Sequence, residues 1–79
     1  MKVTVKLVQW GMGMREGTIL KWLKEVGDWV DEGESLVEVE TDKVTQEMAC
    51  PTAGTLQERL VDEGETVAVR SPIAVLEAG

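Results

Sequence analysis

The residue best placed to do chemistry is a lysine within the run Glu40-Thr41-Asp42-Lys43-Val44. An exposed lysine amine is protonated at neutral pH and is therefore a poor nucleophile by itself. Acylation of Lys43 would require an enzyme that removes its proton and supplies an activated acyl group. The chemistry that this run can support is covalent modification of the chain by another protein.

Autonomous catalysis and metal binding are disfavoured because the chain contains no histidine. Histidine is the commonest general base and the commonest metal ligand in proteins. The single cysteine, Cys50, lacks the usual base of a cysteine nucleophile and the partners of a zinc site. One cysteine also excludes an internal disulfide and fits a reducing compartment. We expect Cys50 to be a small residue at a strand end.

The composition predicts one small acidic domain over residues 1–79. Fifteen acidic residues against eight basic ones give a net charge of −7. Nucleic-acid phosphates require clustered lysine and arginine, so we expect no nucleic-acid partner. No stretch approaches the roughly 20 apolar residues of a membrane span, and no signal peptide is visible. We therefore expect no membrane partner and a cytoplasmic or organelle-matrix location.

An internal repeat indicates the elements that would position the lysine. Residues 17–40 align without a gap on residues 54–77. Six aligned pairs are identical: Gly17 and Gly54, Thr18 and Thr55, Leu23 and Leu60, Gly27 and Gly64, Val30 and Val67, and Glu40 and Glu77. We therefore expect two copies of one β unit, with Lys43 in the segment that joins them.

Short strands between regular turns predict an all-β fold. Residues 2–7 alternate polar and apolar side chains with the period of a half-buried strand. Residues 20–26 also fit a helical spacing, but their repeat counterpart lacks it, so we expect strands in both copies. The expected strands are residues 2–7, 17–22, 36–40, 44–49, 54–58, 66–69 and 73–77, with a short piece near 29–30. The duplication predicts two sheets related by a pseudo-two-fold axis.

The lysine run is expected to form the tip of a hairpin. Val37 and Val39 precede it with the period of a strand. Asp42 is expected to fix the turn by bonding nearby backbone amides. Lys43 would then project into water from the end of a stiff β structure, where a modifying enzyme can reach it. An ordinary surface lysine at a hairpin is the alternative interpretation.

The run and its surroundings resemble the lipoyl attachment region of lipoyl domains from 2-oxo acid dehydrogenase complexes. Besides residues 40–44, the resemblance is carried by residues 16–19, 27–30, 32–36, 51–55, 63–67 and 72–76. It extends over essentially the whole chain. It implies a flattened β-barrel, or barrel-sandwich hybrid, of two four-stranded sheets with the attachment lysine on a hairpin tip.

By this resemblance, the chain is a swinging-arm carrier domain from the dihydrolipoyl acyltransferase component of a 2-oxo acid or acetoin dehydrogenase complex. A lipoyl-attaching enzyme would join lipoic acid to Lys43, with Glu40, Thr41, Asp42 and Val44 as the recognition hairpin. The implied partners are a thiamine-dependent decarboxylase, an acyltransferase core and dihydrolipoyl dehydrogenase. The domain itself would be non-catalytic, because the carried chemistry belongs to the cofactor.

The first loop contains three large apolar residues, Trp10, Met12 and Met14. In the family that this chain resembles, the corresponding loop lies close to the lysine hairpin. It could contact the decarboxylase or shelter the dithiolane, and packing against the core is the alternative for Trp10. Trp22 and Trp29 are both expected to be packing residues.

Two other functions remain open from the residues alone. A biotinyl carrier domain of a carboxylase would share the fold, but its motif flanks the lysine with methionines rather than with Asp42 and Val44. An unmodified barrel-sandwich module would serve only as an interaction domain, and such modules usually lack the attachment lysine. The mass of the adduct on Lys43, or its absence, distinguishes the three functions.

Overall fold

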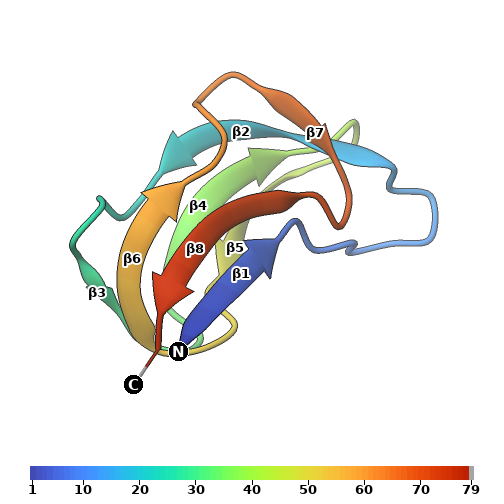
Figure 1. Cartoon of the computed structure of the whole chain (residues 1–79). Helices are drawn as coiled ribbons and strands as arrows, with labels where there is room; N and C mark the ends of the chain where they lie inside the picture. Colours follow the sequence, from blue (N-terminus) through green and yellow to red (C-terminus); the bar gives the residue numbers. More distant parts are fainter. Residues whose placement is uncertain (79) are drawn as a thin grey trace.

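The computed structural model describes residues 1–78, and within them the chain forms strands and turns with no helix (Figure 1). The strands are β1 Lys2–Lys6, β2 Glu16–Trp22, β3 Trp29–Val30, β4 Ser35–Glu40, β5 Thr45–Ala49, β6 Gly54–Arg59, β7 Thr66–Ala68 and β8 Pro72–Glu77. Every expected strand is present, and its ends differ from the expected ones by at most one residue. A membrane-crossing helix is accordingly not found in the described part of the chain.

The strands form two four-stranded sheets, and every pairing within them is antiparallel. One sheet has the order β1-β8-β6-β3 and the other has the order β5-β4-β2-β7. The two sheets curve around a shared interior, and turns carry the chain from one sheet to the other (Figure 1). The expected flattened barrel of two four-stranded sheets is confirmed.

A pseudo-two-fold axis relates the two sheets. Replacing β2, β3, β4 and β5 by β6, β7, β8 and β1 converts one strand order into the other. The registers agree as well, because β2 and β4 have an irregularity just after Ile19, and β6 and β8 have one just after Leu56. Ile19 and Leu56 occupy the same position in the sequence repeat, so the duplication extends to the strand pairing.

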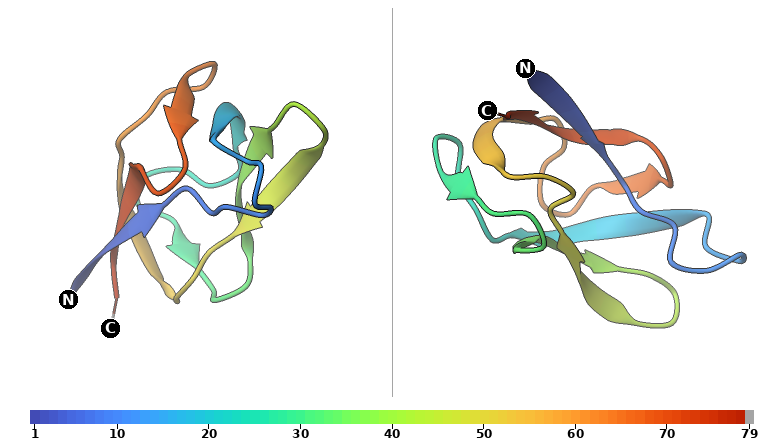
Figure 2. Two further views of the ribbon diagram at one scale, coloured as in Figure 1. Left: turned by 90° about the vertical axis from the view of Figure 1, so that its right-hand side faces the viewer. Right: turned by 90° about the horizontal axis from the view of Figure 1, so that it is seen from below.

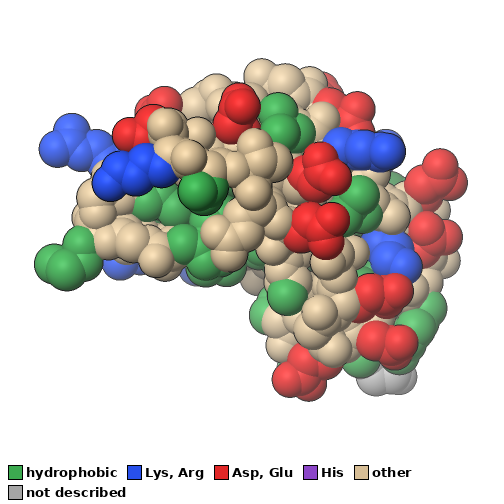
Figure 3. Space-filling view, turned by 180° about the vertical axis from the view of Figure 1, so that it is seen from behind, with side chains coloured by type: hydrophobic (Ala, Val, Ile, Leu, Met, Phe, Trp, Pro, Cys, Tyr) green, Lys and Arg blue, Asp and Glu red, His purple; other side chains and the backbone are tan. Residues whose placement is uncertain are grey.

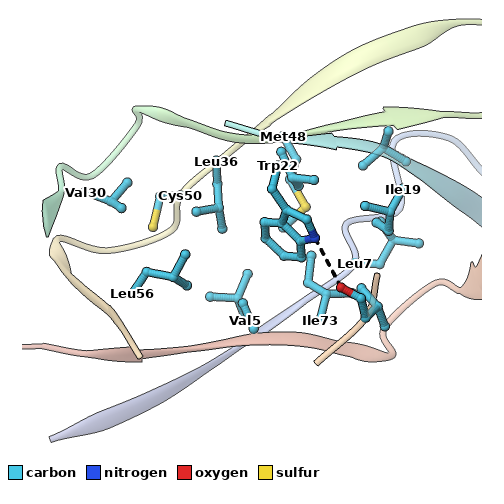
Figure 4. Packing of buried hydrophobic residues seen from close by; sticks show 14 of the residues in the cluster. Val5, Leu7, Ile19, Trp22, Val30, Leu36, Met48, Cys50, Leu56 and Ile73 are labelled. Carbon is cyan, nitrogen blue, oxygen red and sulfur yellow. Dashed lines mark hydrogen bonds between the residues drawn. The ribbon is translucent and has the colours of Figure 1, made fainter. Parts of the chain in front are cut away.

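Fifteen buried hydrophobic residues fill the space between the sheets, and no polar or charged residue of residues 1–78 is buried with them. Figure 4 shows Trp22 crossing this interior, where its indole Nε1 donates a hydrogen bond to the carbonyl oxygen of Val61 at 3.1 Å. The bond satisfies the one polar group of a large buried ring. Packing of Trp22 is confirmed.

The expectation that Trp29 packs inside is wrong. Its side chain is 54% exposed, and its indole Nε1 donates to Asp31 Oδ1 at 2.8 Å. The two residues of β3 point to opposite faces of the sheet, and Val30 occupies the inner one. Trp29 therefore faces solvent.

The ends of the described chain lie where the pseudo-two-fold axis places the counterpart of the β4–β5 hairpin. The amide of Ala78 donates to the carbonyl oxygen of Met1 at 2.8 Å. The amino-terminal ammonium also pairs with Glu77 at 2.9 Å. Figure 2 shows the N and C labels side by side, at the end of the molecule opposite the β4–β5 hairpin in both views.

Candidate attachment site at the β4–β5 hairpin

The hairpin that carries the lysine grows directly out of the core. At its base Val37, Val39 and Met48 are fully buried, and β4 lies between β5 and β2 in its sheet. Glu40 pairs with Thr45 at the end of the ladder. The four residues between them form the tip, which is therefore held at a fixed position relative to the barrel.

The tip is closed by backbone and side-chain hydrogen bonds from one residue. The Thr41 amide donates to the Val44 carbonyl oxygen at 2.8 Å. The Thr41 hydroxyl accepts hydrogen bonds from the amides of Lys43 at 3.3 Å and Val44 at 3.2 Å. Its oxygen also lies 3.1 Å from the Val44 carbonyl oxygen, to which it donates.

The role expected for Asp42 is taken by Thr41. Asp42 and Lys43 both have negative φ, since Arg70 is the one non-glycine residue with positive φ in residues 1–78. The tip is therefore not a primed two-residue turn of the kind that best matches strand twist. The Thr41 hydroxyl supplies the acceptor for two amides at the tip, and within the described chain the Asp42 carboxylate has no hydrogen bond. The signal available in the sequence was a threonine at the first position of a turn.

The five predicted site residues lie together at this tip, and all except Thr41 are exposed. Val44 leaves 53% of its surface open, although it is apolar. Within residues 1–78, neither Glu40 nor Asp42 forms an ion pair with Lys43. The lysine amine is thus accessible to an enzyme, and two carboxylates remain free beside it.

The first loop, residues 10–14, lies against one flank of the hairpin, as expected. A groove of about 340 Å³ separates them and is lined by this loop, by residues 41–44 and by Gln46. The loop has a defined conformation, because the Met14 amide donates to the Gly11 carbonyl oxygen at 3.1 Å and Gln9 Nε2 donates to the Met14 carbonyl oxygen at 3.1 Å. Trp10 and Met14 also pack on the core.

A second groove, of about 430 Å³, adjoins the first, since Gly13, Thr41 and Asp42 line both, and its lining is more polar. Arg15, Glu16 and Thr18 line its wall on β2 and the residues before it, and Glu40 and Asp42 line the hairpin wall. An apolar groove and a charged groove therefore both border the hairpin. This charged groove was not predicted from the sequence, because Arg15 and Glu16 are distant from Lys43 along the chain.

Other reactive groups in the described chain are not arranged for catalysis. Cys50 is buried, and burial raises the pKa of its thiol. The thiol lies 3.1 Å from the Thr52 carbonyl oxygen, to which it donates. Within residues 1–78, no group of three or more histidine, cysteine, aspartate or glutamate side chains is placed to hold a metal ion. The lysine hairpin is therefore the candidate site.

Comparisons with known proteins agree with this geometry. The family model Biotin_lipoyl, described as "Biotin-requiring enzyme", matches residues 3–76. The dihydrolipoyllysine-residue succinyltransferase component of a 2-oxoglutarate dehydrogenase complex from Staphylococcus saprophyticus is 52% identical over 75 residues, covering 95% of this chain and 18% of that protein. The dihydrolipoyllysine-residue acetyltransferase component of a pyruvate dehydrogenase complex from Corynebacterium glutamicum is 50% identical over 70 residues, covering 89% of this chain and 10% of that protein.

A solved structure is similar over its whole length. The lipoyl domain of the 2-oxoglutarate dehydrogenase complex from Azotobacter vinelandii matches with a TM-score of 0.74 and 29% sequence identity, covering 98% of this chain and 99% of that one. The chain spans less than a fifth of each of the two curated relatives but all of a lipoyl domain. It therefore belongs to the Biotin_lipoyl family and has the fold of a lipoyl domain.

Proposed function

We propose that this chain is the lipoyl carrier domain of a dihydrolipoyl acyltransferase, with lipoic acid joined to Lys43 in amide linkage. The observation that carries the proposal is an exposed lysine at the apex of a hairpin whose tip is fixed by Thr41, with no ion-pair partner among residues 1–78. The similarity to acyltransferase components and to a lipoyl domain supports the same assignment.

The residues of the hairpin fit this attachment. A lipoyl-attaching enzyme would remove the Lys43 proton, and the amine would attack the carbonyl carbon of an activated lipoyl group and expel its leaving group. Thr41 keeps the backbone of the lysine in one conformation, so the enzyme meets a preformed surface. Glu40, Asp42 and Val44 complete the recognition hairpin. Loss of the ammonium changes the net charge of the chain from −7 to −8.

The chain's contribution is attachment, recognition and reach, while the bound lipoyl group supplies the acyl-carrying and electron-carrying chemistry. The proposed partners are a thiamine-dependent decarboxylase, an acyltransferase core and dihydrolipoyl dehydrogenase. Tethering of the carried group to one polypeptide raises its effective concentration at each of these active sites. A cytoplasmic or organelle-matrix location belongs to the same proposal.

The acyl group is not determined by this domain. Two relatives with nearly equal identity, 52% and 50%, are named as succinyltransferase and acetyltransferase components. Within residues 1–78, neither groove beside the hairpin contains a buried charged side chain that would distinguish succinyl from acetyl. We infer that selection of the acyl group is made by the decarboxylase and the acyltransferase core.

The experiment that tests the proposal is the intact mass of the chain produced in cells supplied with lipoic acid, followed by peptide mapping. One lipoyl adduct on Lys43 is expected, and Lys43→Ala should abolish it without unfolding the domain. Lys21→Ala is the matched control, because Lys21 is an exposed lysine on β2 outside the hairpin. A biotin adduct would assign the chain to the carboxylases. No adduct with an active attaching enzyme would leave an unmodified interaction module.

A further inference from the structure

The first loop breaks the pseudo-two-fold symmetry of the molecule. The connection from β1 to β2 comprises residues 7–15, whereas its counterpart from β5 to β6 comprises only residues 50–53. The additional residues lie beside the lysine hairpin and form the outer wall of the apolar groove. The groove is thus a feature of the lysine end alone and does not follow from the barrel itself.

Two of the apolar side chains that line this groove are largely exposed. Met12 is 100% exposed at the loop, and Val44 is 53% exposed on the hairpin. Figure 3 shows a hydrophobic side chain protruding below basic side chains at the end of the back face that carries the loop, whereas most of the acidic side chains on this face lie toward the other end. An apolar surface of this kind, held on an ordered loop, indicates a contact that the bare chain does not make.

The position of Lys43 identifies the occupant, because this residue lines the groove itself. A group attached to its Nζ begins at the rim and is held at a high effective concentration there. Amide formation removes the charge that keeps the side chain in water and adds an apolar chain. The volume of about 340 Å³ is at the lower end of the range for small-molecule sites, about 300–1,000 Å³.

We propose that the oxidised lipoyl group on Lys43 folds back into this groove and rests with its dithiolane ring against Trp10, Met12 and Met14. This inference rests on the proposed function of the chain. Sulfur atoms make favourable contacts with aromatic rings, and methionine adapts to irregular apolar shapes. The adjoining groove, lined by Arg15, Glu16 and Asp42, is more polar and contains neither Trp10 nor the two methionines. The groove shelters the ring until a partner enzyme binds the hairpin.

The test compares the lipoylated chain with two lipoylated variants, each of which replaces an exposed apolar residue by glutamine. Met12→Gln removes apolar surface from the groove, and Val26→Gln alters a 56% exposed residue in the turn between β2 and β3, outside the groove. Nuclear Overhauser effects are expected between the lipoyl methylenes and the Met12 ε-methyl group and Trp10 indole protons. They are expected to persist in Val26→Gln.

The second readout is the rate at which dithiothreitol reduces the dithiolane to two thiols, the reagent being oxidised to its cyclic disulfide. If the ring is in the groove three-quarters of the time, reduction is about fourfold slower than for free lipoamide, because only the released fraction reacts. Met12→Gln should restore most of the reduction rate of free lipoamide, and Val26→Gln should leave the rate unchanged.

The outcomes separate the two proposals. Absence of a lipoyl adduct by intact mass would overturn the proposed function and, with it, this inference. A complete adduct on Lys43 with no Overhauser effect to the loop, and with reduction as fast as for lipoamide, would overturn only the resting position. Equal acceleration in Met12→Gln and Val26→Gln would also overturn it, because the protection would not depend on the groove.

Discussion

The two ends of this barrel are equivalent by the internal duplication but are built differently. At the lysine end, the amide of Thr41 bonds the carbonyl oxygen of Val44 at 2.8 Å, and at the other end the amide of Ala78 bonds that of Met1 at the same distance. The first apex is a continuous hairpin with a hydroxyl that fixes it, and the second is held by an ion pair between the chain ends. The β-strand frame is common to both ends of the barrel, so the candidate site is determined by the residues at the lysine end.

The largest effect expected from this comparison concerns two equivalent buried glycines. A Cβ atom at Gly54 would lie 2.7 Å from the carbonyl oxygen of Glu77, whereas one at Gly17 would lie 2.6 Å from the Val39 Cγ1 atom. A backbone atom in a ladder cannot move as a methyl group can. Gly54→Ala should therefore lower the free energy of unfolding by about 3 kcal/mol and Gly17→Ala by about 1–2 kcal/mol. Urea denaturation measures both, and the reverse order would contradict the assignment of the larger cost to the backbone contact at Gly54.

The next prediction concerns the hydroxyl that distinguishes the two apices. Thr41→Val removes the acceptor of two amides at the tip, and we expect a loss of about 1 kcal/mol in the free energy of unfolding. The amides of Lys43 and Val44 should lose protection from hydrogen exchange, and attachment of lipoic acid should slow. Thr41→Ser keeps the hydroxyl and is the control. Unchanged hydrogen exchange in Thr41→Val would show that the turn keeps its conformation without the Thr41 hydroxyl.

A smaller effect is expected at the turn that precedes β4 in one repeat and β8 in the other. Gly33 has φ of 85°, and its counterpart Arg70 has φ of 69°. A side chain in this region costs about 1–2 kcal/mol in backbone strain. Gly33→Arg should destabilise the domain by about 1 kcal/mol. Arg70→Gly should stabilise it by about 0.5 kcal/mol, because the strain that is relieved exceeds the additional entropy of a glycine in the unfolded chain. Arg70 Nη2 donates a hydrogen bond to Gln9 Oε1 at 3.1 Å. Thermal unfolding measures both variants, and destabilisation in both would indicate that this hydrogen bond outweighs the backbone strain at Arg70.

The smallest expected effect is the pH dependence of two exposed glutamates. A hydrogen bond from Lys24 and one from the Asp31 amide lower the pKa of Glu34, and a hydrogen bond from the amino-terminal ammonium lowers the pKa of Glu77. A depressed carboxyl pKa contributes stability above the ordinary glutamate value, and this stability is lost as the pH falls through the folded value.

Removing the cationic partners should raise the pKa values of the two carboxyl groups by different amounts. Lys24→Met leaves Glu34 its backbone hydrogen bond, which is 2.9 Å long, so its pKa should stay partly depressed. Acetylation of the amino terminus should return the pKa of Glu77 closer to the ordinary value. Carboxyl-detected NMR titration of the two variants measures both changes. A larger rise for Glu34 than for Glu77 would contradict the assigned causes.

The fold could be predicted from the sequence because its signals are repeated. Period-two patterns and the gapless alignment of residues 17–40 with 54–77 predicted the strands and the two sheets. The equivalence of β1 to β5 was not visible, because strand pairing uses backbone atoms and requires no shared side chains. Trp29 was misplaced because a two-residue strand shows no alternation.

The position of the hairpin was predicted, but its internal bonding was not. The hairpin tip and its exposed residues follow from the flanking strands, so Lys43 was placed correctly on the surface. Which side chain binds the turn depends on φ angles, and Thr41 rather than Asp42 has that role. The groove beside the tip depends on how the first loop folds across the barrel, which no local pattern encodes.

The position of the chain ends has a mechanical consequence. Because Met1 and Ala78 are bonded to each other at the end opposite Lys43, any polypeptide attached to either of them leaves the barrel there. The domain is then attached at one end only, and Lys43 lies at the opposite, free end. Tension in the attached polypeptide pulls away from the lysine, so the hairpin can turn toward any enzyme surface that it meets. Several such domains joined in one polypeptide would all keep their lysines uncovered.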